Sequence, residues 1–198
     1  MNKEWEDKIV KGCLKGKRLA FKQLFELYKD DMFRVCRAYA PNYDVANDFL
    51  QEGFLKVFQN LHKYDKKRSL GGWMRRVMIN NSIDMLRRDH WDKIVVTLSE
   101  EYDQGRPVRM ENDFERRLNS SSFFEVLDKL PLGYKTILNL HYLEGLTHKD
   151  IADKLGITEG SSKSQLSKAK KYLKGTLLKE MSINEIEEYV GQLAKEVV

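Results

Sequence analysis

The sequence predicts an all-α fold of two small helical domains joined by a flexible linker, and three observations support this prediction. Apolar residues recur at the three- and four-residue spacing of amphipathic helices through most of the 198 residues. The longest strand-like run is the short IVVTL at 94–98, which we assign to the start of the linker. The residues after it hold Gly105, Pro107 and many charges without a sustained apolar period, which is typical of a linker.

The first predicted domain, residues 1–93, contains three helices over residues 18–39, 44–61 and 70–88. Pro41 breaks the apolar pattern between the first two helices, and the polar segment HKYDKKRS separates the second from the third. The residues expected to face inward are Phe21, Leu24, Phe25, Tyr28, Met32, Val35, Cys36 and Tyr39 in the first helix, Leu50, Phe54, Val57, Phe58 and Leu61 in the second, and Trp73, Val77, Ile83 and Leu86 in the third.

The second predicted domain covers residues 122–175, after a linker over 94–121 and before a C-terminal extension over 176–198. It begins with the helical segments FFEVLDKL and YKTILNLHYLEG, which Pro131 separates. The extension contains MSINEIEEYVGQLAKEVV, whose apolar residues recur at helical spacing. It is either an amphipathic helix docked on the second domain or a frayed tail, and we favour the docked helix.

The segment 147–173 predicts a helix-turn-helix. Thr147 can cap a short helix with Asp150 as its partner, Gly156 supplies the left-handed residue that ends this helix, and Thr158 caps the next one. The second helix is expected to bury Leu166, Ala169 and Leu173 and to expose Lys163, Lys168, Lys170 and Lys171. A basic second helix after a glycine-containing turn is typical of a major-groove reader. The alternative is an ordinary helical hairpin with a solvated lysine face.

Charge is unevenly distributed along the chain, which has a net charge of +5 and a pI near 9.0. Residues 63–93 hold nine basic against four acidic residues, and residues 154–174 hold six lysines against Glu159 alone. The segment between them, 98–113, is acidic. Two basic patches separated by an acidic tether predict two contact sites on one polyanion.

The composition favours a cytoplasmic protein without catalytic activity. We expect no membrane insertion because no apolar run approaches the roughly 18 residues of a membrane span, and no secretion because the N-terminus lacks an apolar region. Cys13 and Cys36 are not at metal-ligand spacing and are expected to be reduced. The four histidines lack ligand spacing and no phosphate-binding loop occurs, so we expect no metal, no cofactor and no small-molecule substrate.

Three motifs, in this order along the chain, resemble the extracytoplasmic-function group of the sigma-70 family of bacterial RNA polymerase sigma factors. DVANDFLQEGFLKVF resembles the family's acidic helix, and SLGGWMRRVMINNSIDMLRR resembles its promoter-melting helix. Residues 127–173 resemble the domain that reads the −35 element, and the ending GSSKSQLSKAKKYL most resembles versions from Bacteroidetes-type bacteria. The matching positions are Asp48, Gln51, Glu52 and Phe54 in the first motif and Trp73, Asn80, Asp84 and Arg87 in the second.

The resemblance implies that the first domain melts the −10 element. The loop at 62–71 would capture a flipped base, and arginines of the following helix would contact phosphates. Trp73 is either a core residue or a wedge at the edge of the melted segment. The implied −10 residues are Lys63, Tyr64, Asp65, Lys66, Ser69, Trp73, Arg76, Asn80, Arg87 and Arg88, with Asn80 as the base-edge reader.

The same resemblance implies that the helix beginning at Glu159 reads the −35 element. The implied contacts are Ser161, Lys163, Ser164, Gln165, Ser167 and Lys168. Many relatives have Gly-Thr-Val where this chain has Gly160, Ser161 and Ser162, and others have arginines or an aromatic residue at 165, 167 and 168. The −35 sequence of better-known members therefore does not transfer to this chain.

The resemblance also implies protein partners. The acidic helix face with Asp48, Gln51 and Glu52 would bind the coiled-coil clamp of the core polymerase's largest subunit, and an anti-sigma factor is expected to regulate the chain. Two other functions fit parts of the sequence less well. A stand-alone helix-turn-helix activator would carry a receiver with alternating strands and helices, and a nucleic-acid enzyme or RNA-binding adaptor finds no catalytic cluster here. The predicted function is promoter-specific initiation of transcription.

Overall fold

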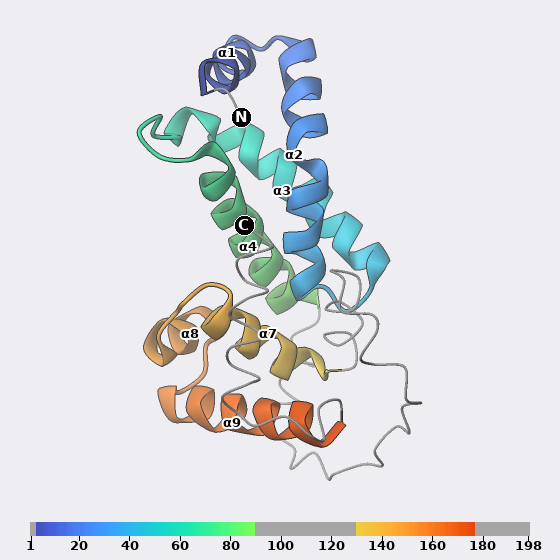
Figure 1. Cartoon of the computed structure of the whole chain (residues 1–198), viewed down its shortest axis with the longest axis vertical. Helices are drawn as coiled ribbons and strands as arrows, with labels where there is room; N and C mark the ends of the chain where they lie inside the picture. The colour runs from blue at the N-terminus through green and yellow to red at the C-terminus, as the bar shows by residue number, and fades with distance from the viewer. Residues whose placement is uncertain (1–2, 90–129, 177–198) are drawn as a thin grey trace. The chain divides into compact units, whose positions relative to one another are not determined.

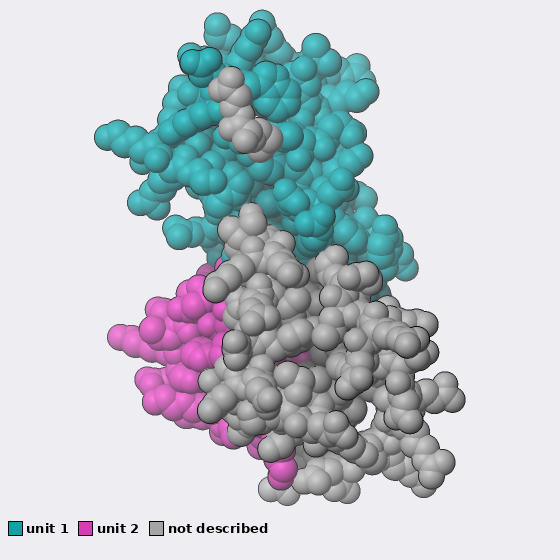
Figure 2. Space-filling model, in the orientation of Figure 1, with its two compact units in different colours: residues 1–85 teal, residues 86–198 magenta. Residues whose placement is uncertain are grey.

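The computed structural model describes residues 3–89 and 130–176, and all regular secondary structure within these ranges is helical (Figure 1). The predicted all-α fold class is confirmed. The chain divides into two compact units, residues 1–85 and 86–198, drawn in different colours in Figure 2. None of the helices in the described ranges has the length and apolar character needed to cross a membrane.

Unit 1 contains α1 (Lys3–Leu14), α2 (Arg18–Tyr39), α3 (Tyr43–Asn60), the 3-10 turn η1 (Leu61–Lys63) and most of α4 (Leu70–Asp89), whose last four residues, 86–89, fall in unit 2. Helices α2, α3 and α4 begin and end within a residue or two of their predicted bounds. Asn42 accounts for the start of α3, because its side chain accepts a hydrogen bond from the amide of Val45 at 2.9 Å. Helix α1 lies before the first helix that the apolar pattern predicted.

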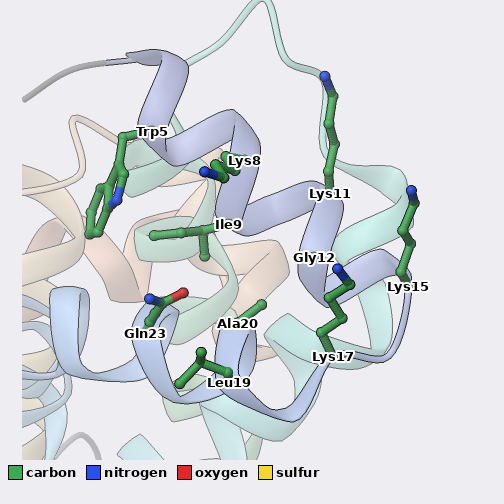
Figure 3. Close-up of a pocket in the computed structure, with 10 residues that line it drawn as sticks. All are labelled: Trp5, Lys8, Ile9, Lys11, Gly12, Lys15, Lys17, Leu19, Ala20 and Gln23. Atoms are coloured by element: carbon green, nitrogen blue, oxygen red, sulfur yellow. The ribbon is translucent and has the colours of Figure 1, made fainter.

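Helix α1 packs closely on the start of α2. A Cβ atom built on Gly12 would lie 2.7 Å from the Cβ of Ala20, so only glycine at position 12 allows this approach. Gly16, at φ 71°, turns the chain between the two helices. A hollow of about 350 Å³ remains between them, with Ile9 and Ala20 among its lining residues and Lys8, Lys11, Lys15 and Lys17 around it (Figure 3).

Aromatic side chains join α2 to α3. Phe21 meets Phe58 with ring centroids 5.0 Å apart, and Phe25 meets Phe54 at 4.7 Å. The apolar stripe predicted for α2 supplies much of the core of unit 1, because Leu24, Val35 and Cys36 are almost fully buried. Burial raises the pKa of Cys36 to about 12 and that of Cys13 to about 11, so both thiols remain protonated at neutral pH.

The buried face of α4 differs from the predicted one. Leu70, Met74 and Met78 face the core, whereas Trp73 and Val77 are only half-buried. The predicted inward positions Ile83 and Leu86 are buried. The shift has a packing cause: a Cβ at Gly53 of α3 would clash with the sulfur of Met78, so the flexible methionines interlock with a small residue on the neighbouring helix.

One buried polar residue ties α4 to α3. Asn81 is fully buried, and its Nδ2 donates a hydrogen bond to the carbonyl oxygen of Phe49 at 3.1 Å. Lys56 and Asp84 add an ion pair of 3.4 Å at the surface of the same two helices. Because a buried Nδ2 without a partner would be costly, this contact favours one register of α4 against α3, although the Asn81 Oδ1 has no hydrogen-bond partner.

Unit 2 contains α7 (Leu132–Tyr142), α8 (His148–Leu155) and α9 (Glu159–Thr176). Ile137 and Leu138 of α7, Ile151 and Leu155 of α8, and Leu166 and Ala169 of α9 form its core. The predicted inward positions Leu166 and Ala169 are confirmed. The description of unit 2 does not extend to the side chain of Leu173.

The predicted caps of the helix-turn-helix are present. Thr147 and Asp150 form a reciprocal capping box, and Gly156 at φ 67° ends α8 in the left-handed conformation. The Thr158 hydroxyl accepts a hydrogen bond from the amide of Ser161 at 3.0 Å at the start of α9. Local sequence therefore sets both ends of the turn.

Other predictions fall outside the described residues. They are the linker 94–121, the helix predicted from FFEVLDKL and the docked helix in the extension 176–198. The domain boundaries at 93/94, 121/122 and 175/176 stay predictions.

Candidate nucleic-acid interface

The first predicted site, the loop at 62–71, corresponds to η1 and the turn that follows it, which together we call loop 61–69. Asp65 Oδ1 accepts a hydrogen bond from the amide of Lys67 at 3.0 Å, and the Asp65 carbonyl accepts one from the amide of Arg68 at 3.0 Å. The Tyr64 hydroxyl donates to the carbonyl of Arg68 at 2.7 Å. These bonds give the loop a compact shape, so Asp65 and Tyr64 maintain its conformation.

Ser69 joins the loop to α4. Its hydroxyl accepts a hydrogen bond from the amide of Gly72 at 3.3 Å, and its carbonyl accepts one from the amide of Trp73 at 3.1 Å. Ser69 therefore occupies the position of an N-cap, which satisfies amide groups at the start of α4. The loop exposes Lys63 and Lys66 together with Lys67 and Arg68, two basic side chains that the predicted site residues omitted.

The remaining predicted −10 residues lie along α4. Trp73, Arg76, Asn80 and Arg87 recur at spacings of three, four and seven residues, so they share one helix face, beside the buried Leu70–Met74–Met78 face. Arg76, Asn80, Arg87 and Arg88 are exposed, and Trp73 is half-buried. The ring of Trp73 lies 5.7 Å from that of Tyr64, which connects the loop with this face.

In unit 2, α9 carries the predicted −35 residues. Lys163, Ser164, Ser167 and Lys168 are exposed, and Ser161 is half-buried with its hydroxyl 2.9 Å from that of Thr158. Lys163 forms an ion pair of 2.7 Å with Glu159 one turn earlier, and both side chains are at least half exposed. Because solvent screens exposed pairs strongly, a phosphate can replace Glu159 as the partner of Lys163 at little cost.

The structure differs from the prediction at Gln165. This side chain is 3 % exposed and lies on the buried side of α9 with Leu166 and Ala169. Helical geometry explains the difference, because position 165 is separated from 169 by one turn and therefore shares its inward face. Gln165 is not part of the exposed face that Lys163, Ser164, Ser167 and Lys168 form.

A histidine contact that the sequence patterns did not predict joins α8 to α9. Nδ1 of His148 lies 3.0 Å from the hydroxyl of the buried Ser162, and the His148 ring stacks on His141 with centroids 4.9 Å apart. Burial, then the neighbouring His141 and Lys163, lower the pKa of His148. The imidazole is therefore biased towards its neutral form, in which it bridges the two helices of the motif.

The acidic face of α3 is the predicted polymerase contact. Asp44, Asp48 and Gln51 are exposed, and Glu52 is half-buried. Leu55, which follows Gln51 by one turn, is 56 % exposed and was not predicted. A large apolar side chain beside carboxylates is the composition of a protein contact with an apolar centre and a charged rim. The exposure of Leu55 could have been predicted, because this leucine lies outside the inward apolar stripe of an amphipathic helix.

Within the described ranges, no group of three or more histidine, cysteine, aspartate or glutamate side chains is arranged to hold a metal ion.

Two family models match the chain, and together they span more than half of it. The model of sigma-70 region 2 matches residues 24–92, and that of sigma-70 region 4 matches residues 121–173. The first match contains α3, loop 61–69, α4 and most of α2, and the second contains α7, α8 and most of α9.

Curated relatives match over most of their own lengths. The ECF RNA polymerase sigma factor SigW of Bacillus subtilis is 27 % identical over 86 % of this chain and 95 % of the relative. SigM of the same species is 28 % identical over 77 % and 91 %, and the sigma-E factor of Haemophilus influenzae is 25 % identical over 85 % and 93 %. A solved complex of the sigma factor RpoE with the anti-sigma factor NepR from Bartonella quintana is also similar. Its TM-score is 0.47 at 20 % identity, and the match covers 82 % of this chain and 98 % of that one.

The likeness of the C-terminal motif to Bacteroidetes-type versions stays a prediction. Three findings identify the same family. Regions 2 and 4 occur in the sigma-70 order, and the curated sigma factors match over nearly their full length. The second region contains a helix-turn-helix with a capping box and a left-handed glycine. This chain belongs to the extracytoplasmic-function group of the sigma-70 family.

Proposed function

We propose that this chain binds core RNA polymerase and directs promoter-specific initiation of transcription. Loop 61–69 and the exposed face of α4 recognise and open the −10 element, and the exposed face of α9 reads the −35 element. The observation that carries the proposal is that exposed basic side chains lie on loop 61–69 and α4 and again on α9, in segments whose sequences match sigma-70 regions 2 and 4. Such faces bind phosphates and base edges.

At the −10 element, the loop supplies a shaped surface for a base and α4 supplies charge. Lys63 and Lys66 hold the strand by its phosphates, while Tyr64, Asp65 and Ser69 maintain the loop that surrounds the base. Asn80 reads a base edge, and Arg76, Arg87 and Arg88 contact phosphates along α4. Trp73, half-buried beside Tyr64, offers a ring edge to the first melted position.

At the −35 element, α9 lies in the major groove. Lys163 and Lys168 provide the charged contacts, and Ser161, Ser164 and Ser167 provide hydroxyl groups that can donate or accept. A lysine bonded to guanine contributes about 1–3 kcal/mol of discrimination. Because serines contact any base with similar geometry, this face distinguishes fewer base pairs than an arginine-rich one would.

Core polymerase binds the acidic face of α3. Asp48, Gln51 and Glu52 meet a basic surface, and Leu55 fills an apolar hollow at its centre. The chain itself needs no catalytic chemistry for this role, and the role places it in the cytoplasm with the polymerase. An anti-sigma factor that covers the same faces regulates it, as the family resemblance implies.

In vitro transcription with purified core polymerase tests the proposal, and no promoter sequence has to be chosen in advance. A DNA pool with randomised −35 and −10 segments is transcribed with and without the chain, and the RNA products are sequenced. We expect RNA from a small subset of templates that share two sequence elements, only when the chain is present. Equal products without the chain contradict the proposal, and activation of another sigma factor's transcription would indicate a stand-alone activator.

A further inference from the structure

Helix α1 contacts the loop that forms the −10 site, although α1 precedes the residues that match sigma-70 region 2. A second link passes through Tyr28 of α2, whose hydroxyl donates a hydrogen bond of 2.7 Å to Oε1 of Glu6. Tyr28 is 5 % exposed. Burial and the bond to Glu6 raise the pKa of Tyr28, so the hydroxyl remains a donor throughout the physiological range.

The ring edge of Tyr28 beside its hydroxyl supports the start of α4. A Cβ atom built on Gly71 would lie 3.2 Å from Cε1 of Tyr28, closer than most real contacts. The ring therefore lies directly beneath the backbone that follows Ser69. A single side chain connects α1, through its hydroxyl, with the end of loop 61–69, through its ring edge.

Tyr64 connects the same region with the middle of the loop. Its hydroxyl closes the loop on the Arg68 carbonyl, and its ring packs near Trp73. Burial, followed by the negative charges of Glu6 and Asp7, raises the pKa of Tyr64. The carboxylates of α1 thus act electrostatically on the central residue of the loop.

We propose that Glu6 and Tyr28 are positioning residues that hold loop 61–69 in the conformation that receives a −10 base. This inference rests on the proposed function of the loop. Ordering a loop of this length has an entropic cost that a few internal hydrogen bonds offset only in part. The bond from Tyr28 to the carboxylate of Glu6 is charge-assisted and hence stronger than one between neutral groups. It keeps α1 against the loop before DNA arrives, so less ordering remains for the binding step.

A packing residue without this role would behave differently. Loss of ordinary packing at Tyr28 would destabilise unit 1 as a whole and would weaken polymerase binding and −10 opening in parallel. Loss of a positioning contact loosens loop 61–69 and the step that uses it, and leaves the acidic face of α3 and the −35 face unchanged. Tyr28→Phe separates the two cases because it keeps the ring against Gly71 and removes only the hydroxyl.

The first measurement needs no polymerase. Hydrogen exchange of the full chain is followed by mass spectrometry for Tyr28→Phe and Glu6→Ala, with Tyr43→Phe and Glu26→Ala as matched controls. Tyr43 is 62 % exposed, and Glu26 pairs at the surface with Lys29 on its own helix. We expect amides of loop 61–69 to exchange roughly tenfold faster in the two test variants, which corresponds to about 1.4 kcal/mol. The controls should match the wild type, as should α2 and α3 in every variant.

The second measurement uses the holoenzyme on a promoter selected from the randomised pool. Opening is followed by the fluorescence of 2-aminopurine placed in the −10 element of the non-template strand. Affinity for core polymerase and for the closed promoter is measured alongside. We expect opening to slow by a similar, roughly tenfold factor in Tyr28→Phe and Glu6→Ala, with both affinities unchanged. The double variant should be no slower than either single variant, because both remove one contact.

The outcomes are distinct. If the amides of loop 61–69 exchange in Tyr28→Phe at the wild-type rate, the inference is overturned. It is also overturned if the affinity for polymerase, the affinity for the closed promoter and the rate of opening all decrease in parallel. Loosening of the loop without slower opening also overturns it. If the wild-type chain supports no initiation, the proposed function fails, while the exchange measurement still decides whether Glu6 and Tyr28 hold the loop.

Discussion

At the scale of single residues, the exposed lysines of α9 carry the prediction that is easiest to isolate. Lys163→Ala and Lys168→Ala each remove one charged contact from a face whose other members are serines. We expect a roughly 5- to 150-fold loss of discrimination at one −35 position, following the about 1–3 kcal/mol of a lysine–guanine pair. The measurement is transcription from promoters with single −35 substitutions.

Lys22→Ala is the matched control, because Lys22 is an exposed lysine in unit 1 and its replacement changes the net charge equally. A uniform loss across all −35 variants would assign the lysines to phosphates. An unchanged −35 preference would remove them from the interface.

The histidine between α8 and α9 predicts a pH dependence of stability. The pKa of His148 in the folded chain lies below its ordinary value near 6.5, so the unfolded chain binds the proton more readily. The contribution of neutral His148 to the free energy of unfolding is complete above pH 6.5, and it decreases as the pH falls from 6.5 towards the lowered pKa. Chemical denaturation at about pH 7.5 and about pH 5.5, on either side of the ordinary value, measures it. In His148→Gln the difference between the two pH values should shrink, and an equal difference in both proteins would contradict the assignment.

At the scale of elements, the turn between α8 and α9 depends on a left-handed residue. Gly156→Ala places a Cβ at φ 67°, which costs roughly 1–2 kcal/mol of unfolding free energy. Gly160→Ala is the matched control in the first turn of α9, where the new Cβ would have only an ordinary contact of 3.8 Å with Thr158. We expect Gly160→Ala to stabilise by up to about 1 kcal/mol because alanine favours helix. Denaturant midpoints of the two variants should move in opposite directions.

Helix α3 offers a second test at this scale. Asp48→Arg reverses one charge in the middle of the acidic face, so we expect it to abolish binding to core polymerase while circular dichroism shows an unchanged helical content. Opposing like charges across an interface cost several kcal/mol. Asp30→Arg, an equal charge reversal at an exposed position of α2, should bind as the wild type does. Binding is measured by competition with a labelled wild-type chain.

At the scale of the whole molecule, the two basic faces should contribute independently to promoter affinity. Each phosphate contact adds about 0.9 to the slope of log affinity against log salt concentration. Arg76→Ala in unit 1 and Lys168→Ala in unit 2 should each lower the holoenzyme's slope by at most this amount, and the double variant by their sum. Salt titrations of promoter binding measure the slopes. A double variant no different from one single variant would show that the two positive charges do not both neutralise DNA charge.

Much of the fold followed from local patterns. Asn42, Thr147, Asp150 and Gly156 set helix ends through hydrogen bonds and backbone angles that depend on a few neighbouring residues, so such ends can be predicted from sequence. The buried face of α4 could not be predicted from its local pattern, because a stripe through Trp73 and a stripe through Met74 are both apolar. The choice between them depends on Gly53 of another helix.

The candidate site divides in the same way. The exposure of Lys163 and Lys168 could be predicted from the inward apolar stripe of α9. The burial of Gln165 could not, because a polar residue is not part of an apolar stripe. The contact of His148 with Ser162 spans two helices and has no local signal. Helix α1 was not predicted, although Ile9, Val10 and Cys13 recur at helical spacing. This apolar pattern is short and lies in a strongly charged segment.

By itself, the sequence determined the helical class, the order of the elements, the caps of the helix-turn-helix and the family resemblance, because these depend on periodicity, local hydrogen bonding and motif order. Tertiary structure decided which side of α4 faces the core, that Gln165 is inside and Leu55 outside, and that Glu6 reaches Tyr28 beneath loop 61–69. These features depend on side chains far apart in the chain, and only packing brings them together.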